Sequence, residues 1–181
     1  MEAGGPPIIG NGRHPAAAMD AARVAQVIHA LGSRGISVWV HGGWGIDALL
    51  GEQTREHDDL DLVVQRIDCP RLVATLAGHG YRVAKGAAPT NFVLLDAAGH
   101  QVDIHPVRFA PNGDGIYHME TGEDWPFPAA GFAGHGRIGG REVRCLTAEV
   151  EVLCHSGYEL DDEDRADLAA LAERFGVAIP A

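Results

Sequence analysis

The strongest constraint on the fold is a segment in which a short apolar strand runs through two glycines into a helix. Residues 36–40 are mostly β-branched or aromatic, as in a buried strand, and Gly42 and Gly43 follow closely. Apolar residues with helical spacing occupy 44–50. Glycine lets the backbone approach a ligand, and a helix start offers free N–H groups to an anion. The segment predicts strand, turn and helix, either as a phosphate site or as a tight turn without a ligand.

A second predicted strand, at 58–64, carries acidic side chains on one face. Residues two apart share a face, so Asp59 and Asp61 project together while Leu60 and Leu62 point into a core. Paired carboxylates on a half-buried strand repel each other unless a cation lies between them, and hard divalent ions prefer oxygen ligands. We therefore predict a Mg²⁺ site, with a solvated acidic strand end as the alternative.

A third carboxylate lies on a further predicted strand. Residues 91–95 and 100–105 are typical of two strands around a turn, and Asp103 is polar within the second of them. Three carboxylates on neighbouring strands beside a glycine turn match a two-metal site, which needs ligands for the ions and a base beside the attacking hydroxyl.

This combined pattern resembles the DNA polymerase β-like nucleotidyltransferase superfamily. Within it, the chain is similar to the small antibiotic nucleotidyltransferases, first the lincosamide and then the aminoglycoside 2''-nucleotidyltransferases. The resemblance extends over residues 20–173, and it is carried by the runs 42–47, 54–61, 102–106 and 155–160. It implies an α+β fold: a polymerase β-like core, which is a mixed sheet with helices on one side, followed by a small, mainly helical C-terminal part.

The resemblance also implies a reaction and roles for residues. A nucleoside monophosphate would pass from ATP or GTP to a hydroxyl of a small molecule, a lincosamide- or aminoglycoside-like antibiotic, with release of pyrophosphate. Asp59 and Asp61 would be ligands shared by two Mg²⁺ ions, and Asp103 would be the third ligand and the general base. Gly42 and Gly43 would lie against the triphosphate.

Two residues between the turn and the carboxylate strand are candidates for binding the nucleotide. Arg55 and His57 could steady phosphate oxygens, although Arg55 could equally pair with Glu52 or Glu56 on the surface. For Asp47 we expect a buried hydrogen-bonding role toward the following loop rather than a catalytic one.

The acceptor site is predicted between the core and the C-terminal part. Trp125 and Tyr158 could instead be packing residues, and His155 a satisfied core histidine. The candidates for lining the site are Tyr117, Glu120, Trp125, His155 and Tyr158.

One departure from the lincosamide enzymes concerns positive charge. The segment 89–91 lacks the basic residue that the resemblance leads us to expect, and Lys85 or Arg108 could compensate. The net charge is −11, with only 14 Lys and Arg, which argues against a free-standing nucleic-acid binder and suits a cationic small molecule.

Signals for a membrane or for secretion are not recognisable in the sequence, so we expect a cytoplasmic enzyme. Cys69, Cys145 and Cys154 have no C-x-x-C spacing and are expected to be reduced, mostly buried thiols. A homodimer is plausible because the resembled lincosamide enzymes associate, but no residue demands it.

Three parts are expected along the chain: a flexible leader at 1–14, the nucleotidyltransferase core at 15–109, and a C-terminal acceptor-binding part at 110–181. Segment 110–133 is either a binding loop or a packed connection. The other expected elements are helices at 19–31, 69–79, 147–155 and 162–175, and a hairpin at 137–144 that turns at Gly139–Gly140.

Two rival functions stay open. One is a catalytically idle nucleotidyltransferase-fold module of the antitoxin type, although all three carboxylates are present. The other is an HD-type metal phosphohydrolase, suggested by His41 and His57–Asp58, although strand-like sequence flanks these residues and HD folds are helical. The sequence leaves undecided which acceptor and hydroxyl are used, whether ATP or GTP is preferred, and whether the role is resistance or metabolite modification.

Overall fold

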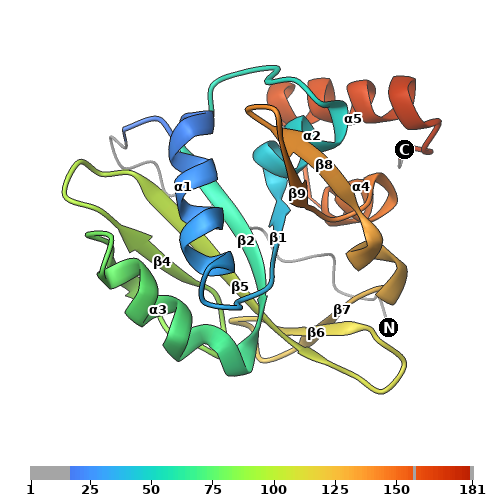
Figure 1. The fold of residues 1–181 in the computed structure, drawn as a ribbon. Helices are drawn as coiled ribbons and strands as arrows, with labels where there is room; N and C mark the ends of the chain where they lie inside the picture. Colours follow the sequence, from blue (N-terminus) through green and yellow to red (C-terminus); the bar gives the residue numbers. More distant parts are fainter. Residues whose placement is uncertain (1–16, 157, 180–181) are drawn as a thin grey trace.

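The computed structural model describes residues 17–156 and 158–179, so the leader expected at 1–14 lies outside the described residues. A mixed sheet forms the centre of the fold (Figure 1). Its strands are β1 (Val38–His41), β2 (Asp59–Gln65), β3 (Arg82–Gly86), β4 (Phe92–Leu95), β5 (Gln101–Phe109), β6 (Gly115–His118) and β7 (Asp124–Phe127). The order is β1-β2-β5-β4-β3, with β6 pairing with the end of β5 and β7 pairing with β6.

Helices and a small hairpin surround this sheet. The helices are α1 (Ala21–Gly32), α2 (Gly42–Leu50), α3 (Cys69–Ala77), α4 (Ala148–Cys154) and α5 (Asp162–Phe175), with 3₁₀ turns η1 (Arg66–Asp68) and η2 (Ala129–Ala133). The hairpin is formed by β8 (His135–Ile138) and β9 (Arg141–Arg144). It turns at Gly139 and Gly140, both with positive φ, as the sequence predicts.

The pairing of β2 with β5 is parallel, whereas the other strand pairs of the described chain are antiparallel. Asp61 lies directly opposite Asp103, and Leu62 opposite Ile104. Parallel neighbours need a long crossover, which here contains α3 and the β3–β4 pair. This register fixes which side chains share a face.

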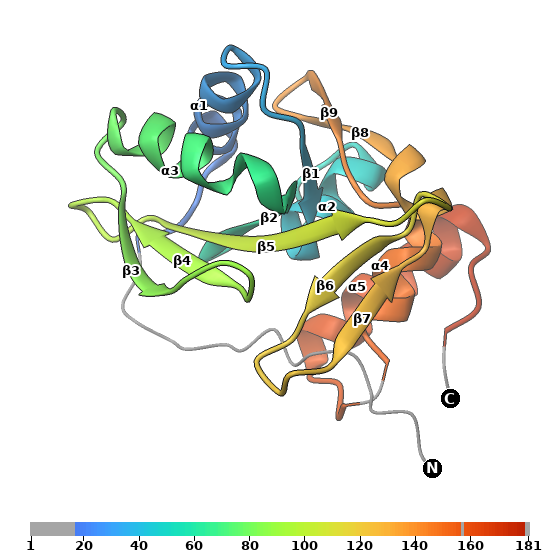
Figure 2. The same ribbon diagram turned by 90° about the horizontal axis from the view of Figure 1, so that it is seen from below.

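The two faces of the sheet are covered by different helices (Figure 2). Leu60, Leu62 and Ile104 are wholly buried in the cluster under α1 and α3. On the other face, Val63 and Val107 pack in a second cluster with Val150 of α4. The mixed sheet, with α1 and α3 on one side and a helical C-terminal part, confirms the expected fold. It also differs from the helical fold that an HD-type phosphohydrolase would have.

Segment 110–133 is a structured connection rather than a long irregular loop, and its role in binding the acceptor stays a prediction. β6 and β7 form an antiparallel hairpin that continues the sheet, and η2 follows. Tyr117 and Phe127 alternate with less buried residues and pack in a cluster with Val150 of α4, which explains why the segment forms strands.

Smaller expectations can also be compared. The helix expected at 69–79 ends at Ala77, because glycines follow and Gly80 has a φ of 90°. All three cysteines are buried free thiols, as expected. Within the described ranges, none of the helices has the length and apolar character needed to cross a bilayer.

Candidate active site

The three predicted carboxylates converge on the face of the sheet opposite α1 and α3. Asp61 of β2 and Asp103 of β5 are direct neighbours across the parallel pair, and Asp59 lies two residues earlier on the same face. The Asp103 side chain is almost buried, with 5% of the residue exposed. Gln101 donates to Asp103 Oδ1 at 2.8 Å, which helps to fix the orientation of that carboxylate.

Burial and mutual repulsion make these carboxylates poor acids. Burial, followed by the charge of Asp61, raises the pKa of Asp59 to about 7 and the pKa of Asp103 to about 7. Burial also raises the pKa of Asp61 to about 6, with Glu151 adding to the effect. A group of partly protonated carboxylates on one surface would be stabilised by positive charge.

This donor set suits a hard divalent cation. In the part of the chain that the structure describes, no three His, Cys, Asp or Glu side chains already converge as a complete set of metal ligands. Mg²⁺, however, usually keeps several waters and is held by one or two carboxylates together with substrate phosphates. Asp59, Asp61 and Asp103 fit an ion of this kind, which would arrive with a nucleotide.

The glycine turn lies directly against the carboxylates. Gly42 has a φ of 64°, and a Cβ placed on it would lie 2.6 Å from Asp61 Oδ2. A Cβ on Gly43 would collide with the His57 ring and lie 3.0 Å from the Arg55 guanidinium. Both positions therefore require glycine because protein side chains press on the turn, a reason that sequence alone did not suggest.

His57 supports the turn from within the protein. Its ring is 3% exposed and hydrogen-bonds to Asp47 Oδ2. Asp47 Oδ1 also accepts from the backbone and hydroxyl of Thr54, at 3.1 and 2.6 Å. The expectation that Asp47 is a buried partner of the following loop is confirmed.

Arg55 is tied to α5. Its guanidinium pairs with Asp167 at 3.0 Å and with Glu163 at 3.2 Å. The predicted alternative of a pair with the Glu52 or Glu56 carboxylate is therefore wrong, because α5 folds back over this loop; Glu56 contributes only its carbonyl oxygen. Arg55 and His57 thus both pack behind Gly43.

Three further residues border the carboxylates. His105 Nε2 lies 3.0 Å from Asp61 Oδ1, and burial followed by the charge of His41 lowers the pKa of His105 to about 4, so its neutral ring donates to Asp61. His41 faces Asp61 across β1 and β2 and pairs with Glu151 at 2.9 Å. Burial opposes charging of His41, but the Glu151 carboxylate outweighs it and raises the His41 pKa.

Sequence reasoning did not assign roles to His105 and Glu151, and it considered His41 only as part of the HD-type alternative. His105 lies two residues after Asp103, so strand alternation could have placed it on the same face. Glu151 is a glutamate flanked by Val150 and Val152 in an apolar helical run, and this position was the available signal for a buried carboxylate.

Two acceptor candidates lie on the hairpin beside the site. Tyr117 and Trp125 are opposite each other and share the carboxylate face. The Tyr117 ring is 6.0 Å from the His105 ring, so a chain of contacts runs from Tyr117 to Asp61. Glu120 lies exposed in the turn between β6 and β7.

The other two candidates follow α4. His155 Nδ1 donates to the Glu151 carbonyl at 2.8 Å, and its Nε2 lies 3.5 Å from Asp164. Both ring nitrogens therefore have a polar neighbour, which agrees with the alternative that His155 is a satisfied histidine of the protein interior. The His155 and Tyr158 rings are 6.3 Å apart, and burial raises the pKa of the Tyr158 hydroxyl.

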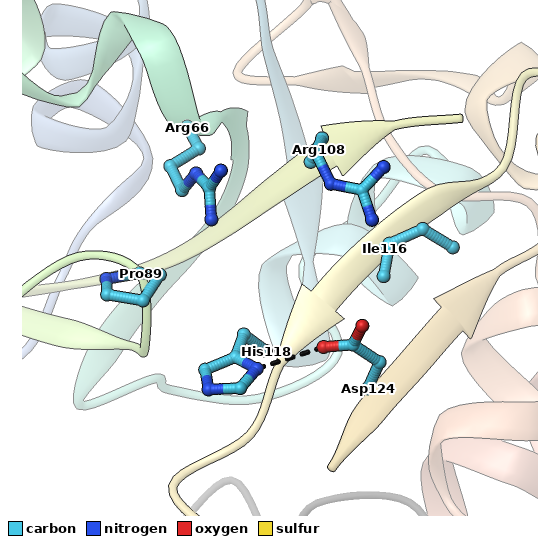
Figure 3. Close-up of a pocket in the computed structure, with 6 residues that line it drawn as sticks. All are labelled: Arg66, Pro89, Arg108, Ile116, His118 and Asp124. Atoms are coloured by element: carbon cyan, nitrogen blue, oxygen red, sulfur yellow. Dashed lines mark hydrogen bonds and ion pairs between the residues drawn. The ribbon is translucent and has the colours of Figure 1, made fainter. Parts of the chain in front are cut away.

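A shallow pocket of about 220 Å³ lies elsewhere, on the opposite face of β5 and β6 (Figure 3). Arg108 is opposite Ile116, whereas the next pair, Val107 and Tyr117, belongs to the carboxylate face. The pocket is lined by Arg66, Pro89, Arg108, Ile116, His118 and Asp124. Arg108 therefore points away from the carboxylates and cannot supply the missing positive charge there.

Lys85 lies on the same face of the sheet as the carboxylates because of an irregularity in β3. The register shifts between Val83 and Lys85, which places Lys85 opposite Val93. Val93 in turn lies opposite Asp103. Paired residues share a face, so Lys85 stands in the same row as Asp103, two strands away, or about 10 Å.

The sequence is similar to those of known antibiotic-modifying enzymes. The family model for aminoglycoside-2''-adenylyltransferase matches residues 23–171. Over 136 residues, the chain is 29% identical to a lincosamide resistance protein of Staphylococcus haemolyticus, covering 75% of this chain and 84% of the relative. It is 33% identical to a 2''-aminoglycoside nucleotidyltransferase of Klebsiella pneumoniae, covering 75% and 72%.

Solved structures of similar overall fold are also found. The lincosamide antibiotic adenylyltransferase LnuA with bound lincomycin superposes with a TM-score of 0.76 at 25% identity, covering 86% of this chain and 98% of LnuA. ANT(2'')-Ia in complex with adenylyl-2''-tobramycin gives a TM-score of 0.69 at 23% identity, covering 86% and 89%, which supports the fold. With its carboxylate face, its glycine turn and a family match over most of its length, this chain belongs to the aminoglycoside-2''-adenylyltransferase family of nucleotidyltransferases.

Proposed function

We propose that this protein transfers a nucleoside monophosphate from Mg²⁺-ATP or Mg²⁺-GTP to a hydroxyl of a lincosamide- or aminoglycoside-like antibiotic, releasing pyrophosphate. The observation that carries the proposal is the convergence of Asp59, Asp61 and Asp103 beside the Gly42 turn on one face of the sheet. The relatives named as lincosamide and aminoglycoside enzymes support the acceptor class.

Each carboxylate has a role in this proposal. Asp59 and Asp61 would hold Mg²⁺, and Asp103 would complete the set of ligands and accept the proton of the attacking hydroxyl. Without metal, burial and the neighbouring carboxylates raise the pKa of Asp103 to about 7, and bound Mg²⁺ would favour the deprotonated form that a general base needs. When bound, Mg²⁺ would neutralise phosphate charge and polarise the reacting oxygens.

The protein also positions the two substrates. Gly43 and the first turn of α2 offer backbone N–H groups to the triphosphate, while Arg55 and His57 hold that turn from behind. Holding nucleotide and acceptor together replaces a collision by an oriented attack, which supplies much of the rate.

The acceptor is placed on the side formed by the C-terminal part, here 110–181. Tyr117 and Trp125 would contribute one wall, His155 and Tyr158 another, and Glu120 a charge near the entrance. The net charge of −11 favours an acceptor that carries amines. A homodimer is part of the proposal and is tested by sedimentation.

The test measures pyrophosphate release from Mg²⁺-ATP and, separately, Mg²⁺-GTP across lincosamides, aminoglycosides and simple sugar alcohols, with mass spectrometry of the acceptor. We expect a product heavier by one nucleoside monophosphate. Asp59→Asn should abolish it, whereas Asp58→Asn, an exposed neighbour outside the site, should not. Binding of Mg²⁺-nucleotide without any transfer would support the idle-module alternative instead.

A further inference from the structure

We propose that Glu151 is a positioning residue, which reaches from α4 to hold His41 and the Gly42 amide and so fixes the glycine turn against Asp61. Its catalytic meaning rests on the function proposed above. The C-terminal part of the chain would then be needed to hold the nucleotide-binding turn, in addition to lining the acceptor site.

Direct contacts carry this inference. Glu151 is completely buried, and its Oε2 lies 2.9 Å from His41 Nδ1 and accepts from Gly42 N at 3.3 Å. His41 is the residue opposite Asp61 across β1 and β2. One carboxylate oxygen therefore joins the last residue of the strand to the first residue of the turn.

The turn is shaped to admit this carboxylate. A Cβ on Gly45 would lie 2.7 Å from Glu151 Oε1 and 3.0 Å from the Val40 carbonyl, so only glycine leaves room. Within the described residues, Glu151 Oε1 has no hydrogen-bond partner. A buried unpaired carboxylate oxygen lowers stability, which is typical of sites where a position is held for function.

The charge on Glu151 is compensated locally. A lone buried carboxylate is strongly unfavourable, but the His41 ring supplies a charge-assisted partner. The His41 ring also lies 5.8 Å from the ring of His105, which hydrogen-bonds to Asp61. His41 and His105 thus form one wall around the Asp61 carboxylate.

A consequence for phosphate binding follows. The Gly42 amide is directed to Glu151, so it is not available to the triphosphate. The N–H groups of the first turn of α2, beginning at Gly43, would donate to the phosphate oxygens. Loss of Glu151 should therefore disturb the turn without touching the acceptor.

The test compares Glu151→Gln with Glu149→Gln, an exposed glutamate two residues away on the same helix. Amide hydrogen exchange over residues 41–46, without any ligand, should accelerate in Glu151→Gln and stay unchanged in Glu149→Gln. In steady-state kinetics, Glu151→Gln should lower kcat about tenfold, which corresponds to about 1.4 kcal/mol, with the KM of the acceptor unchanged.

A double-mutant cycle with His41→Asn completes the experiment. The contact with His41 is the shorter of the two that Glu151 makes, so adding Glu151→Gln to His41→Asn should change kcat less than twofold further; a full tenfold further fall would overturn the role of His41 and leave only the Gly42 contact. His41→Asn is also the second variant if Glu151→Gln unfolds, because it breaks the same contact from the other side.

The outcomes separate this inference from the proposed function. Wild-type exchange and wild-type kcat in Glu151→Gln would overturn the positioning role. An equal fall in kcat for Glu149→Gln would also overturn it, since the effect would then be general. A wild-type protein without any transfer would refute the proposed function, while the exchange measurement would still decide whether Glu151 holds the turn.

Discussion

The two faces of the β2–β5 pair differ sharply, although alternate residues of the same two strands form them. On one face, Leu62 and Ile104 are wholly buried beneath α1 and α3. On the other, Asp61 and Asp103 stand side by side with raised pKa values. The face under α1 and α3 stabilises the fold along the strand pair. On the other face Val63 and Val107 also pack into a core with α4, and the carboxylates lower stability only where they form the reactive surface. At positions 61–62 and 103–104, strand parity therefore separates a reactive side chain from a stabilising one that is its direct neighbour in sequence.

The largest expected effect comes from breaking the acidic face. Asp61→Asn should reduce nucleotidyl transfer on the order of a thousandfold, or about 4 kcal/mol of barrier, because a Mg²⁺ ligand is lost. Tm should stay equal or rise, because repulsion with Asp59 and Asp103 is relieved. Kinetics and calorimetry on the same sample check both parts, and a strong fall in Tm would contradict the separation of the faces.

The complementary change breaks the apolar face one residue away. Leu62→Ala should lower the free energy of unfolding by about 3 kcal/mol, because the side chain is fully buried and leaves a cavity. Denaturant titration measures this loss. The kcat per folded molecule should change less than about threefold, and a loss comparable to that of Asp61→Asn would show that the two faces are not independent.

A smaller effect sharpens the comparison at the sheet edge. Lys85→Ala should raise the KM for nucleotide or acceptor about threefold, since Lys85 shares the carboxylate face. Arg108→Ala is the matched control, because Arg108 lies on the opposite face. Steady-state kinetics at low and high salt checks the difference, and the reverse ranking would refute the face assignment.

The smallest expected effect is a pH-dependent gain in Tm from Mg²⁺. Asp59 and Asp103 have pKa values raised from 3.8 to about 7, so the metal-free fold loses stability as the pH rises through about 7. Mg²⁺ binds the deprotonated carboxylates, so its gain in Tm should be larger at pH 8 than at pH 6. Asp103→Asn should reduce this difference; an equal gain at both pH values would argue against these carboxylates as ligands.

Much of the fold could be predicted because its signals are local. Period-two alternation located β2 and β5, and Gly139–Gly140 located the β8–β9 turn. The convergence of Asp59, Asp61 and Asp103 was anticipated from the joint pattern and the resemblance.

The missing parts depend on long-range contacts. The pairing of Arg55 with α5 and of His41 with Glu151 joins segments more than a hundred residues apart, which no local pattern reports. The face of Lys85 depends on a register shift in β3 that alternation alone would misplace. Segment 110–133 contains many turn-forming residues, and its hairpin becomes evident only from the pairing of β6 with β7 and their packing on α4.

The contact between His41 and Glu151 has a consequence for synthesis of the chain. The two residues are 110 positions apart, and ribosomes add about 5–20 residues per second. The glycine turn and the first carboxylates are therefore made several seconds before the helix that holds them. A nascent chain that has already formed β1 and β2 would lack the completed turn, so activity would begin only after α4 has emerged and docked.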